Sequence, residues 1–90
     1  MNFEWDERKA KSNENKHGIS FDEATTVFGD PLAITYPDPF NSEEEERFIT
    51  FGRTSNGKYL VVSHTDGESS IRIISAREMT SRERTQYEQN

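Results

Sequence analysis

The stretch that decides the fold is RFITFGRTSNGKYLVVSHTDGESSIRIISAR, Arg47–Arg77. Its β-branched and aromatic residues fall in three short runs in which apolar and polar positions alternate, as in half-buried strands. Asn-Gly separates the first two runs and Asp-Gly the last two, and both dipeptides are turn signals. We therefore expect three consecutive antiparallel strands, at residues 47–54, 58–65 and 70–77.

The Asn-Gly turn sets the register of the first hairpin. It can supply the two positive-φ residues of a type I′ turn, so we expect a two-residue loop that pairs Ser55 with Lys58. Arg53 then pairs with Leu60, and Arg72 is expected on the opposite face of the sheet, with Tyr59, Val61 and Ile74. The face that includes Leu60 would carry these apolar residues: Ile49, Phe51, Leu60, Val62, Ile71 and Ile73.

The same register groups Arg53, Ser75 and Arg77 at one end of that face. A second loop of two or four residues keeps this grouping, whereas a loop of three or five residues reverses it. Two guanidinium groups beside a hydroxyl suit a phosphate or carboxylate, because arginine is planar, permanently charged and donates in pairs. The alternative is that each arginine pairs with an acid such as Glu46 or Glu78. Spacing alone leaves both roles open.

A polar helix is expected in FEWDERKAKSNENKHG, Phe3–Gly18. Its first residues, up to Trp5, are expected to form a short strand, followed by Asp6 as the helix N-cap and Gly18 as the C-cap. Within this stretch, almost no apolar residue follows Trp5. The helix therefore either is simply solvated or presents its polar groups to a ligand.

Capping boxes mark two further helices. Ser20 opens a helix with an apolar face, after which a short strand is expected at residues 32–36, and Thr80 opens a polar helix that ends near Glu88. Together these elements predict an α+β fold in a single domain, residues 1–90. Two N-terminal helices and a short C-terminal helix would pack on a twisted, mainly antiparallel sheet of four to five strands.

Composition limits the classes of protein that the chain can represent. Its 90 residues include no cysteine, 30% are hydrophobic and the mean hydropathy is -1.00. Such a short chain buries a small core, so a binding partner is expected. Disulfides and zinc–thiolate sites are excluded. Without a signal peptide or a run of apolar residues long enough to span a bilayer, a cytoplasmic protein with no membrane partner is expected.

The net charge of -6 is unevenly distributed along the chain. Residues 22–46 hold eight acids and no base, including the run Glu43–Glu46, whereas residues 47–90 hold five acids and seven bases. The acidic run is either a solvated loop or a docking edge for a basic partner. Because only the local charge matters for binding an anion, the C-terminal half can present a basic patch on an acidic protein.

Two histidines are the side chains whose ordinary pKa lies near neutrality, His17 and His64. The predicted position of His17 at a helix C-terminus favours its protonated form. His64, opposite Ile49 in the expected register, is more typical of a structural residue than of a catalytic one. The spacing of acids and histidines matches no metal site, and no glycine-rich phosphate loop or nucleophile elbow is present, so no cofactor is expected.

Four blocks of the sequence resemble the BrnT family of toxins: FEWDERKAKSNENKHGISFDEATTVFGDPLAITYPD, EERFITFGR, YLVVSHTDGESSIRIISAR and RERTQYE. The resemblance covers nearly the whole chain. It implies a fold similar to RelE-type ribonuclease toxins and a metal-independent endoribonuclease that cleaves RNA and inhibits translation. It also implies neutralisation by a BrnA-like ribbon-helix-helix antitoxin, so that DNA is contacted only indirectly, through the antitoxin.

The resemblance assigns functional roles to residues within these blocks. Arg53, Arg77 and His17 would be catalytic, and Lys9, Lys16 and Ser75 would contact RNA. Attack of a 2′-OH on the adjacent phosphate needs proton transfer and positive charge near the developing phosphorane, which these residue types supply.

One departure from the family pattern lies beside this site. Glu78 follows Arg77, where many sequences that resemble this one carry a base. The alternative is therefore a weakly active or inactive member that acts as a protein-binding module in a transcriptional regulator.

Overall fold

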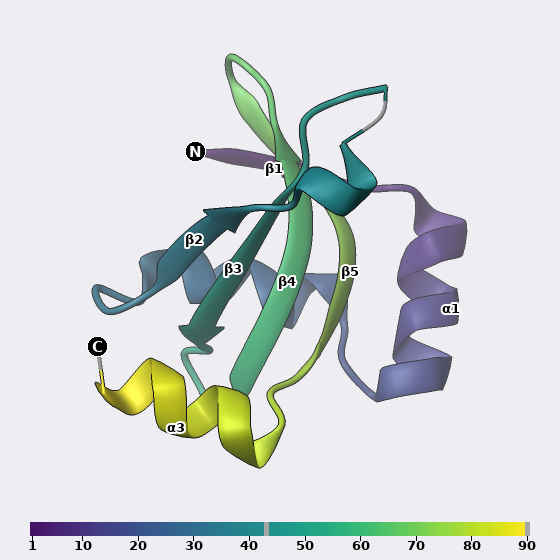
Figure 1. Ribbon diagram of the computed structural model, residues 1–90. Coiled ribbons are helices and arrows are strands. Elements are labelled where there is room, and N and C mark those ends of the chain that lie inside the picture. Colours follow the sequence, from purple (N-terminus) through teal and green to yellow (C-terminus); the bar gives the residue numbers. More distant parts are fainter. Residues whose placement is uncertain (43, 90) are drawn as a thin grey trace.

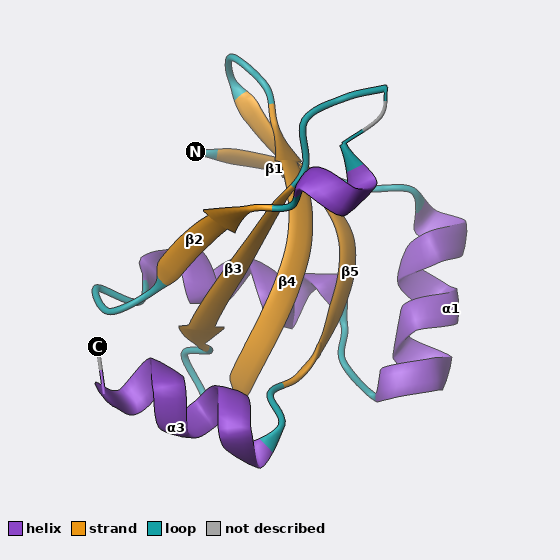
Figure 2. Cartoon of the chain, viewed as in Figure 1, coloured by secondary structure: helices purple, strands orange, loops and turns teal. Residues whose placement is uncertain are grey.

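The computed structural model describes residues 1–42 and 44–89, which form three α-helices and a five-stranded mixed sheet (Figure 1). The elements are β1 (Asn2–Glu4), α1 (Glu7–His17), α2 (Phe21–Thr25), β2 (Ile34–Pro37), β3 (Phe48–Arg53), β4 (Tyr59–Asp66), β5 (Ser70–Glu78) and α3 (Ser81–Gln89). Single 3₁₀ turns follow α2 and β2 (Figure 2). The predicted α+β class is confirmed.

The strands lie in the order β1-β5-β4-β3-β2. β1 runs parallel to β5, and the other neighbours are antiparallel. Figure 1 shows α1 beside β5, α2 behind the sheet and α3 across its front. Different helices therefore pack on the two faces of the sheet, α2 on one and α3 on the other.

The helix ends follow the expected capping chemistry. Asp6 Oδ1 accepts hydrogen bonds from the backbone N–H groups of Arg8 (2.8 Å) and Lys9 (3.4 Å), which α1 cannot satisfy internally. Gly18 ends α1 in the left-handed conformation, with φ at 70°. Ser20 Oγ accepts from the backbone N–H of Glu23 at 3.1 Å and so starts α2.

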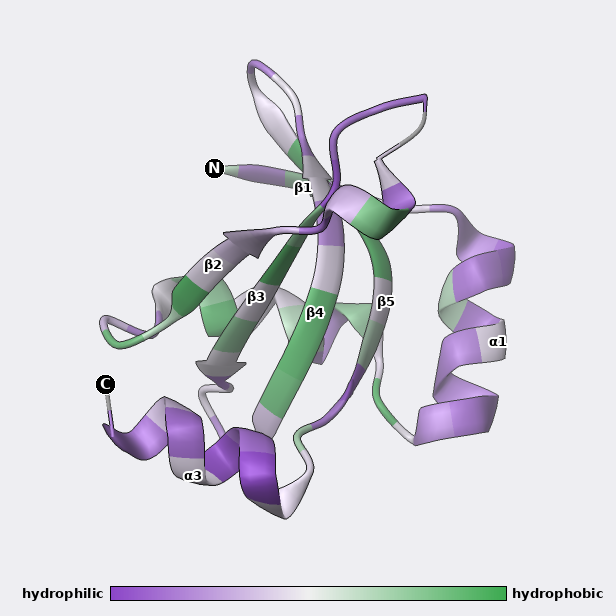
Figure 3. Cartoon of the chain, in the orientation of Figure 1, coloured by the Kyte–Doolittle hydropathy of each residue, from purple (hydrophilic) through white to green (hydrophobic). Residues whose placement is uncertain are grey.

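One hydrophobic core lies between the sheet and α2. The side of the sheet that contacts this core is here called the core face. Its fully buried members are Ile19, Phe21, Ala24, Val27, Leu60, Val62, Ile73 and Ala76. Trp5 meets Phe21 edge-on, with ring centroids 5.9 Å apart, so the start of the chain is anchored to this core. Figure 3 shows the same division: apolar colour concentrates in the strands, while α1 and α3 are polar.

The first hairpin differs from the prediction in its turn. The backbone N–H of Thr54 donates to Lys58 O at 2.7 Å, and Gly57 N–H donates to Thr54 O at 3.0 Å, so the loop has three residues. Only Gly57 has a positive φ (93°), and Asn56 does not. This is a type I turn closed by a glycine bulge, and the predicted type I′ turn was wrong.

The longer loop moves the register by one residue. Arg53 pairs with Tyr59 rather than Leu60, and Thr50 pairs with Val62. Because a shift of one residue exchanges the faces of a strand, the core face takes Thr50 and Gly52 from β3. The predicted face that combined Ile49 and Phe51 with Leu60 and Val62 was therefore wrong.

A bulge in β5 produces a second shift, which compensates for the first. His64 pairs with Ile73, but the adjacent Ser63 pairs with Ser75, so one extra residue of β5, Ile74, lies between the two pairs. Ser75 and Arg77 consequently leave the core face and join the face that carries Arg53. The predicted grouping of these three residues on one face holds. Of their expected apolar neighbours, Ile49 and Phe51 share that face, whereas those of β4 and β5 lie on the core face.

Candidate functional site

The sheet face opposite the core carries most of the arginines of the C-terminal half, and we call it the arginine face. Arg53 ends β3, while Arg72 and Arg77 lie on β5 opposite Thr65 and Val61 of β4. Arg84 reaches this face from α3, which lies across it (Figure 1). Several arginines of an acidic chain are thus gathered on one face of the sheet.

Arg77 is held by a carboxylate from α3. Its Nη1 and Nη2 donate to the two carboxylate oxygens of Glu83 at 2.8 and 3.0 Å, and Nη1 also donates to Glu78 O at 3.2 Å. The hydrogen bonds from Arg77 lower the pKa of Glu83 to about 2, and those to Glu83 raise the pKa of Arg77. The carboxylate orients the guanidinium and, being so acidic, is unsuited to accept a proton near neutrality.

Arg53 has a different environment, with no carboxylate in ion-pair contact among the described residues. Its guanidinium lies 5.6 Å from the centre of the Tyr59 ring, and its backbone N–H donates to Asp30 Oδ2 at 2.8 Å. Asp30 also accepts the hydroxyl of Tyr87 in α3. Burial alone would raise the pKa of Asp30, but hydrogen bonds from Tyr87, Leu32 N–H and Arg53 N–H lower it overall.

The two predicted catalytic arginines share a face but not a partner. One strand, β4, separates β3 from β5, which places their backbones about 10 Å apart. Arg77 faces Glu83, whereas Arg53 faces Tyr59. Ser75 lies on β5 between Arg72 and Arg77 and is half-buried. Its side chain makes no hydrogen bond to any described residue. A ligand that uses both arginines must span the width of β4.

α1 carries the other predicted site residues along the edge of β5. In Figure 1 α1 and β5 run in the same direction, so the C-terminal end of α1 lies toward the end of β5 from which α3 departs. His17 is the last residue of α1. Lys16 is beside it, whereas Lys9 lies two turns earlier, about 10 Å along the helix axis. Both lysines are exposed and form no ion pair with a described residue, while His17 is half-buried.

A residue that the sequence interpretation did not single out, Asn13, fixes α1 in this position. Asn13 Nδ2 donates to Ala76 O at 2.9 Å and to Ile19 O at 3.1 Å, while Ala76 N–H donates to Asn13 Oδ1 at 3.1 Å. β1 pairs only with Ser70–Arg72, so this amide replaces a strand partner farther along the edge. His17 is four positions after Asn13, so both lie on one face of the helix.

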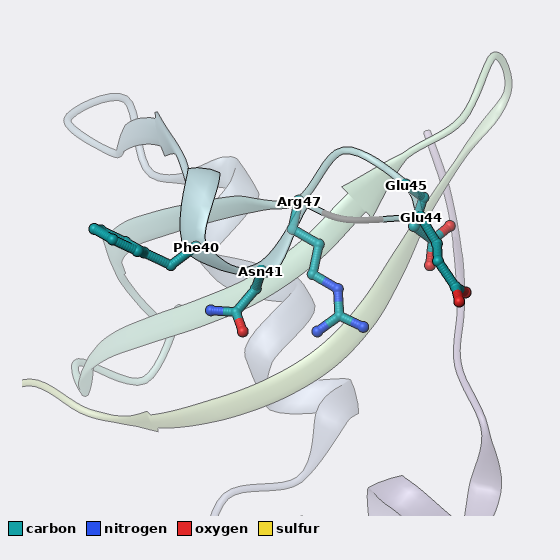
Figure 4. A pocket seen from close by; sticks show the side chains of 5 residues that line it. All are labelled: Phe40, Asn41, Glu44, Glu45 and Arg47. Carbon is teal, nitrogen blue, oxygen red and sulfur yellow. The ribbon is translucent and has the colours of Figure 1, made fainter.

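Arg47 and Arg72 extend the arginine face at the other end of the sheet, and the sequence interpretation assigned neither of them to the site. Arg72 lies on the face of Tyr59 and Val61, as predicted, and it shares that face with Arg53 because the three-residue loop shifts β3 by one residue. Arg72 forms an ion pair with Glu45. Arg47 lines a pocket of about 310 Å³, and Figure 4 shows its guanidinium extended across the sheet.

His64 is buried on the core face and has a structural environment. Its Nε2 lies 2.7 Å from Thr50 Oγ1 and its Nδ1 lies 2.8 Å from Asp66 Oδ1. Burial lowers the pKa of His64, and Asp66 opposes that shift only in part. It pairs with Phe48 rather than with Ile49, the predicted partner.

Within the described residues, no group of three or more acidic or histidine side chains is arranged to hold a metal ion. None of the helices in the described part of the chain is long and apolar enough to cross a membrane.

Comparison with known proteins agrees with this architecture. A family model described as the ribonuclease toxin BrnT of type II toxin–antitoxin systems matches residues 5–83. The fold is similar to the 1.1 Å crystal structure of the Brucella abortus ribonuclease toxin BrnT, with a TM-score of 0.71 and 23% sequence identity. That alignment covers 90% of this chain and 99% of the Brucella chain. The comparison with curated proteins found no match. The chain belongs to the BrnT family of ribonuclease toxins of type II toxin–antitoxin systems.

Proposed function

We propose that this chain is a metal-independent endoribonuclease that cleaves RNA in the cytoplasm and inhibits translation, with residues 1–90 acting as one domain. The observation that carries the proposal is the fixed but unsaturated guanidinium of Arg77. Glu83 and the Glu78 carbonyl occupy both Nη1 protons and one Nη2 proton. Arginine has five N–H donors, so Nε–H and the second Nη2–H remain. These two donors lie side by side and match two oxygens of one phosphate.

The proposed reaction uses the 2′-OH of the substrate as the nucleophile. Arg77 binds the scissile phosphate and stabilises the charge that develops when the 2′-oxygen bonds to phosphorus and the 5′-oxygen leaves. Arg53 assists by holding the RNA in line across the face. His17, at the end of α1, transfers a proton, and Lys9, Lys16 and Ser75 contact RNA. Glu83 serves as the positioning residue for Arg77.

Purified protein tests this directly. Wild type is expected to cleave single-stranded RNA in the presence of EDTA and to leave 2′,3′-cyclic phosphate and 5′-hydroxyl ends, whereas Arg77→Ala is expected to lose at least 100-fold in rate. Arg82→Ala is the matched control, because Arg82 is an exposed arginine of α3 outside the proposed site. Equal cleavage by all three proteins would refute the assignment of Arg77, and intact RNA with wild type would refute the ribonuclease proposal.

Membership of a type II toxin–antitoxin family implies an antitoxin partner, and we propose that it is a BrnA-like ribbon-helix-helix protein that alone contacts DNA. Three exposed apolar side chains on and beside β2 favour a docking surface for it. Leu32, Tyr36 and Phe40 are 65%, 47% and 90% exposed, and Phe40 lines a pocket together with Glu44 and Glu45 of the acidic loop. Apolar groups rimmed by acids suit a basic amphipathic segment. Glu43, also in the predicted acidic run, lies outside the described residues.

The same three side chains support the second candidate function, a catalytically inactive protein-binding module. Measuring both co-purification with the antitoxin and RNA cleavage distinguishes the two functions. Phe40→Glu is expected to weaken antitoxin binding and to leave RNA cleavage unchanged, while Arg77→Ala is expected to do the reverse. A wild-type protein that binds the antitoxin but leaves RNA intact would favour the binding module.

A further inference from the structure

We propose that Arg53, Lys58 and Arg84 form a second phosphate-binding subsite around Tyr59, which holds the RNA backbone beside the scissile phosphate. This rests on the proposed ribonuclease function. The ring of Tyr59 lies 3.9 Å from the Arg84 guanidinium carbon and 5.6 Å from that of Arg53. β3, β4 and α3 thus bring two permanent cations to one aromatic ring.

None of these three cations forms a close, buried ion pair with a carboxylate of the described residues. Arg53 has no ion-pair partner among the described residues. Arg84 lies 3.7 Å from Glu88, but both side chains are about half exposed, and such pairs are weak. Lys58 contacts Glu23 at a long 3.5 Å. The Tyr59 ring attracts each cation but cannot remove the repulsion between them, so a polyanion would be favoured.

The surface at this cluster is hollow and adjoins the proposed catalytic arginine. A pocket of about 400 Å³ is lined by Arg53, Gly57, Lys58, Tyr59, Glu78, Met79 and Arg84. Glu78 and Met79 directly follow Arg77 in β5. An RNA strand can therefore place one phosphate at Arg77 and another in this hollow. Tyr59 in the lining lies on β4 and Arg77 on the neighbouring strand β5, so the two positions suit successive phosphates of one polynucleotide chain rather than a single phosphate group.

Glu78 is the one acid among the described residues that line this hollow. Removing its charge should affect RNA binding in the direction opposite to the loss of a cation. It is exposed, and its side chain forms no ion pair with a described residue. Its charge opposes an incoming phosphate. Replacing it with glutamine removes that repulsion without removing a contact on which the fold depends.

The test measures binding separately from cleavage. A fluorescent single-stranded RNA with 2′-O-methyl groups at every position cannot be cleaved by the proposed route, so its anisotropy reports affinity alone. We expect Arg84→Gln to weaken binding roughly tenfold at low salt. The slope of log K against log salt should fall by about 0.7, the value for one lost phosphate contact on a single strand. Glu78→Gln should tighten binding, and Arg82→Ala should change neither quantity.

Several outcomes would overturn the subsite. Arg84→Gln with wild-type affinity and salt slope would do so, as would an equal loss in Arg82→Ala, which would indicate diffuse attraction. An unchanged RNA affinity with weakened antitoxin binding would assign the hollow to an acidic protein segment instead. Failure of the ribonuclease proposal is distinguishable, because it would show as tight binding of the methylated RNA by a wild type that leaves ordinary RNA intact. Thermal unfolding of Arg84→Gln checks that the fold is retained.

Discussion

Replacing Asn13 with alanine tests whether a single side chain holds α1 on the edge of the sheet. The substitution removes three hydrogen bonds, two with the backbone of Ala76 and one with Ile19 O. Asn13 is only 7% exposed, so the N–H and C=O of Ala76 would lose their partners in a nearly water-free position. Each buried polar group left without a partner costs about 1–3 kcal/mol.

We therefore expect Asn13→Ala to lower the free energy of unfolding by about 3 kcal/mol, a large part of the 5–15 kcal/mol typical of a domain. Urea unfolding followed by the fluorescence of Trp5, the single tryptophan, measures this. Ser12→Ala is the matched control, since Ser12 is exposed on the same helix and should change stability by less than about 0.5 kcal/mol. Asn13→Asp should also destabilise, because a carboxylate cannot donate to the two carbonyls. A loss below about 1 kcal/mol in Asn13→Ala would refute the reasoning.

Three further predictions concern pH and packing. The pKa of Glu83, about 2 in the folded chain against 4.5, means that its contribution to stability is present above pH 4.5 and is lost as the pH falls toward 2; Glu83→Gln should flatten that part of the pH–stability curve. Burial lowers the pKa of His64 below 6.5, so its contribution is present above pH 6.5 and is lost as the pH falls; in His64→Gln this loss near pH 6 should disappear. Gly52→Ala should cost about 1–3 kcal/mol in urea unfolding, because the new Cβ would lie 3.0 Å from Val27 Cβ; wild-type stability would show that the core can move apart there.

The sequence predicted the elements better than their register. Helix caps at Asp6 and Ser20 and the three central strands were correct, because each depends on chemistry within a few residues. The register failed at Asn56, which keeps a negative φ while only the following glycine turns left-handed. Both turn types use the same Asn-Gly dipeptide. In the observed turn the Thr54 hydroxyl accepts from Lys58 N–H at 2.8 Å, a contact that the dipeptide alone does not predict.

The sequence predicted contacts of the candidate site only between residues that are close together in the chain. The grouping of Arg53, Ser75 and Arg77 emerged from two register errors that cancelled, since neither the glycine bulge nor the extra Ile74 was foreseen. Glu83 was foreseen as part of a capping box, and it is one: its Oε1 accepts from Thr80 N–H at 2.9 Å. Its second role, orienting Arg77, depends on how α3 folds back over the sheet and has no signal in local sequence.

The acidic total of the chain is compatible with RNA binding because of where each acid lies. Of the arginines on the arginine face, Arg72 and Arg77 each meet a carboxylate from a flanking segment, Glu45 and Glu83. These pairs neutralise charge without using all the donors of the guanidinium, so Arg77 keeps a second pair of N–H groups for a phosphate. A pairing carboxylate also fixes the direction in which those donors point, which an isolated surface arginine would lack. If Arg77 binds the scissile phosphate as proposed, Glu83 acts by orienting it, and Glu83→Gln should lower the rate of RNA cleavage even though it makes the protein less acidic.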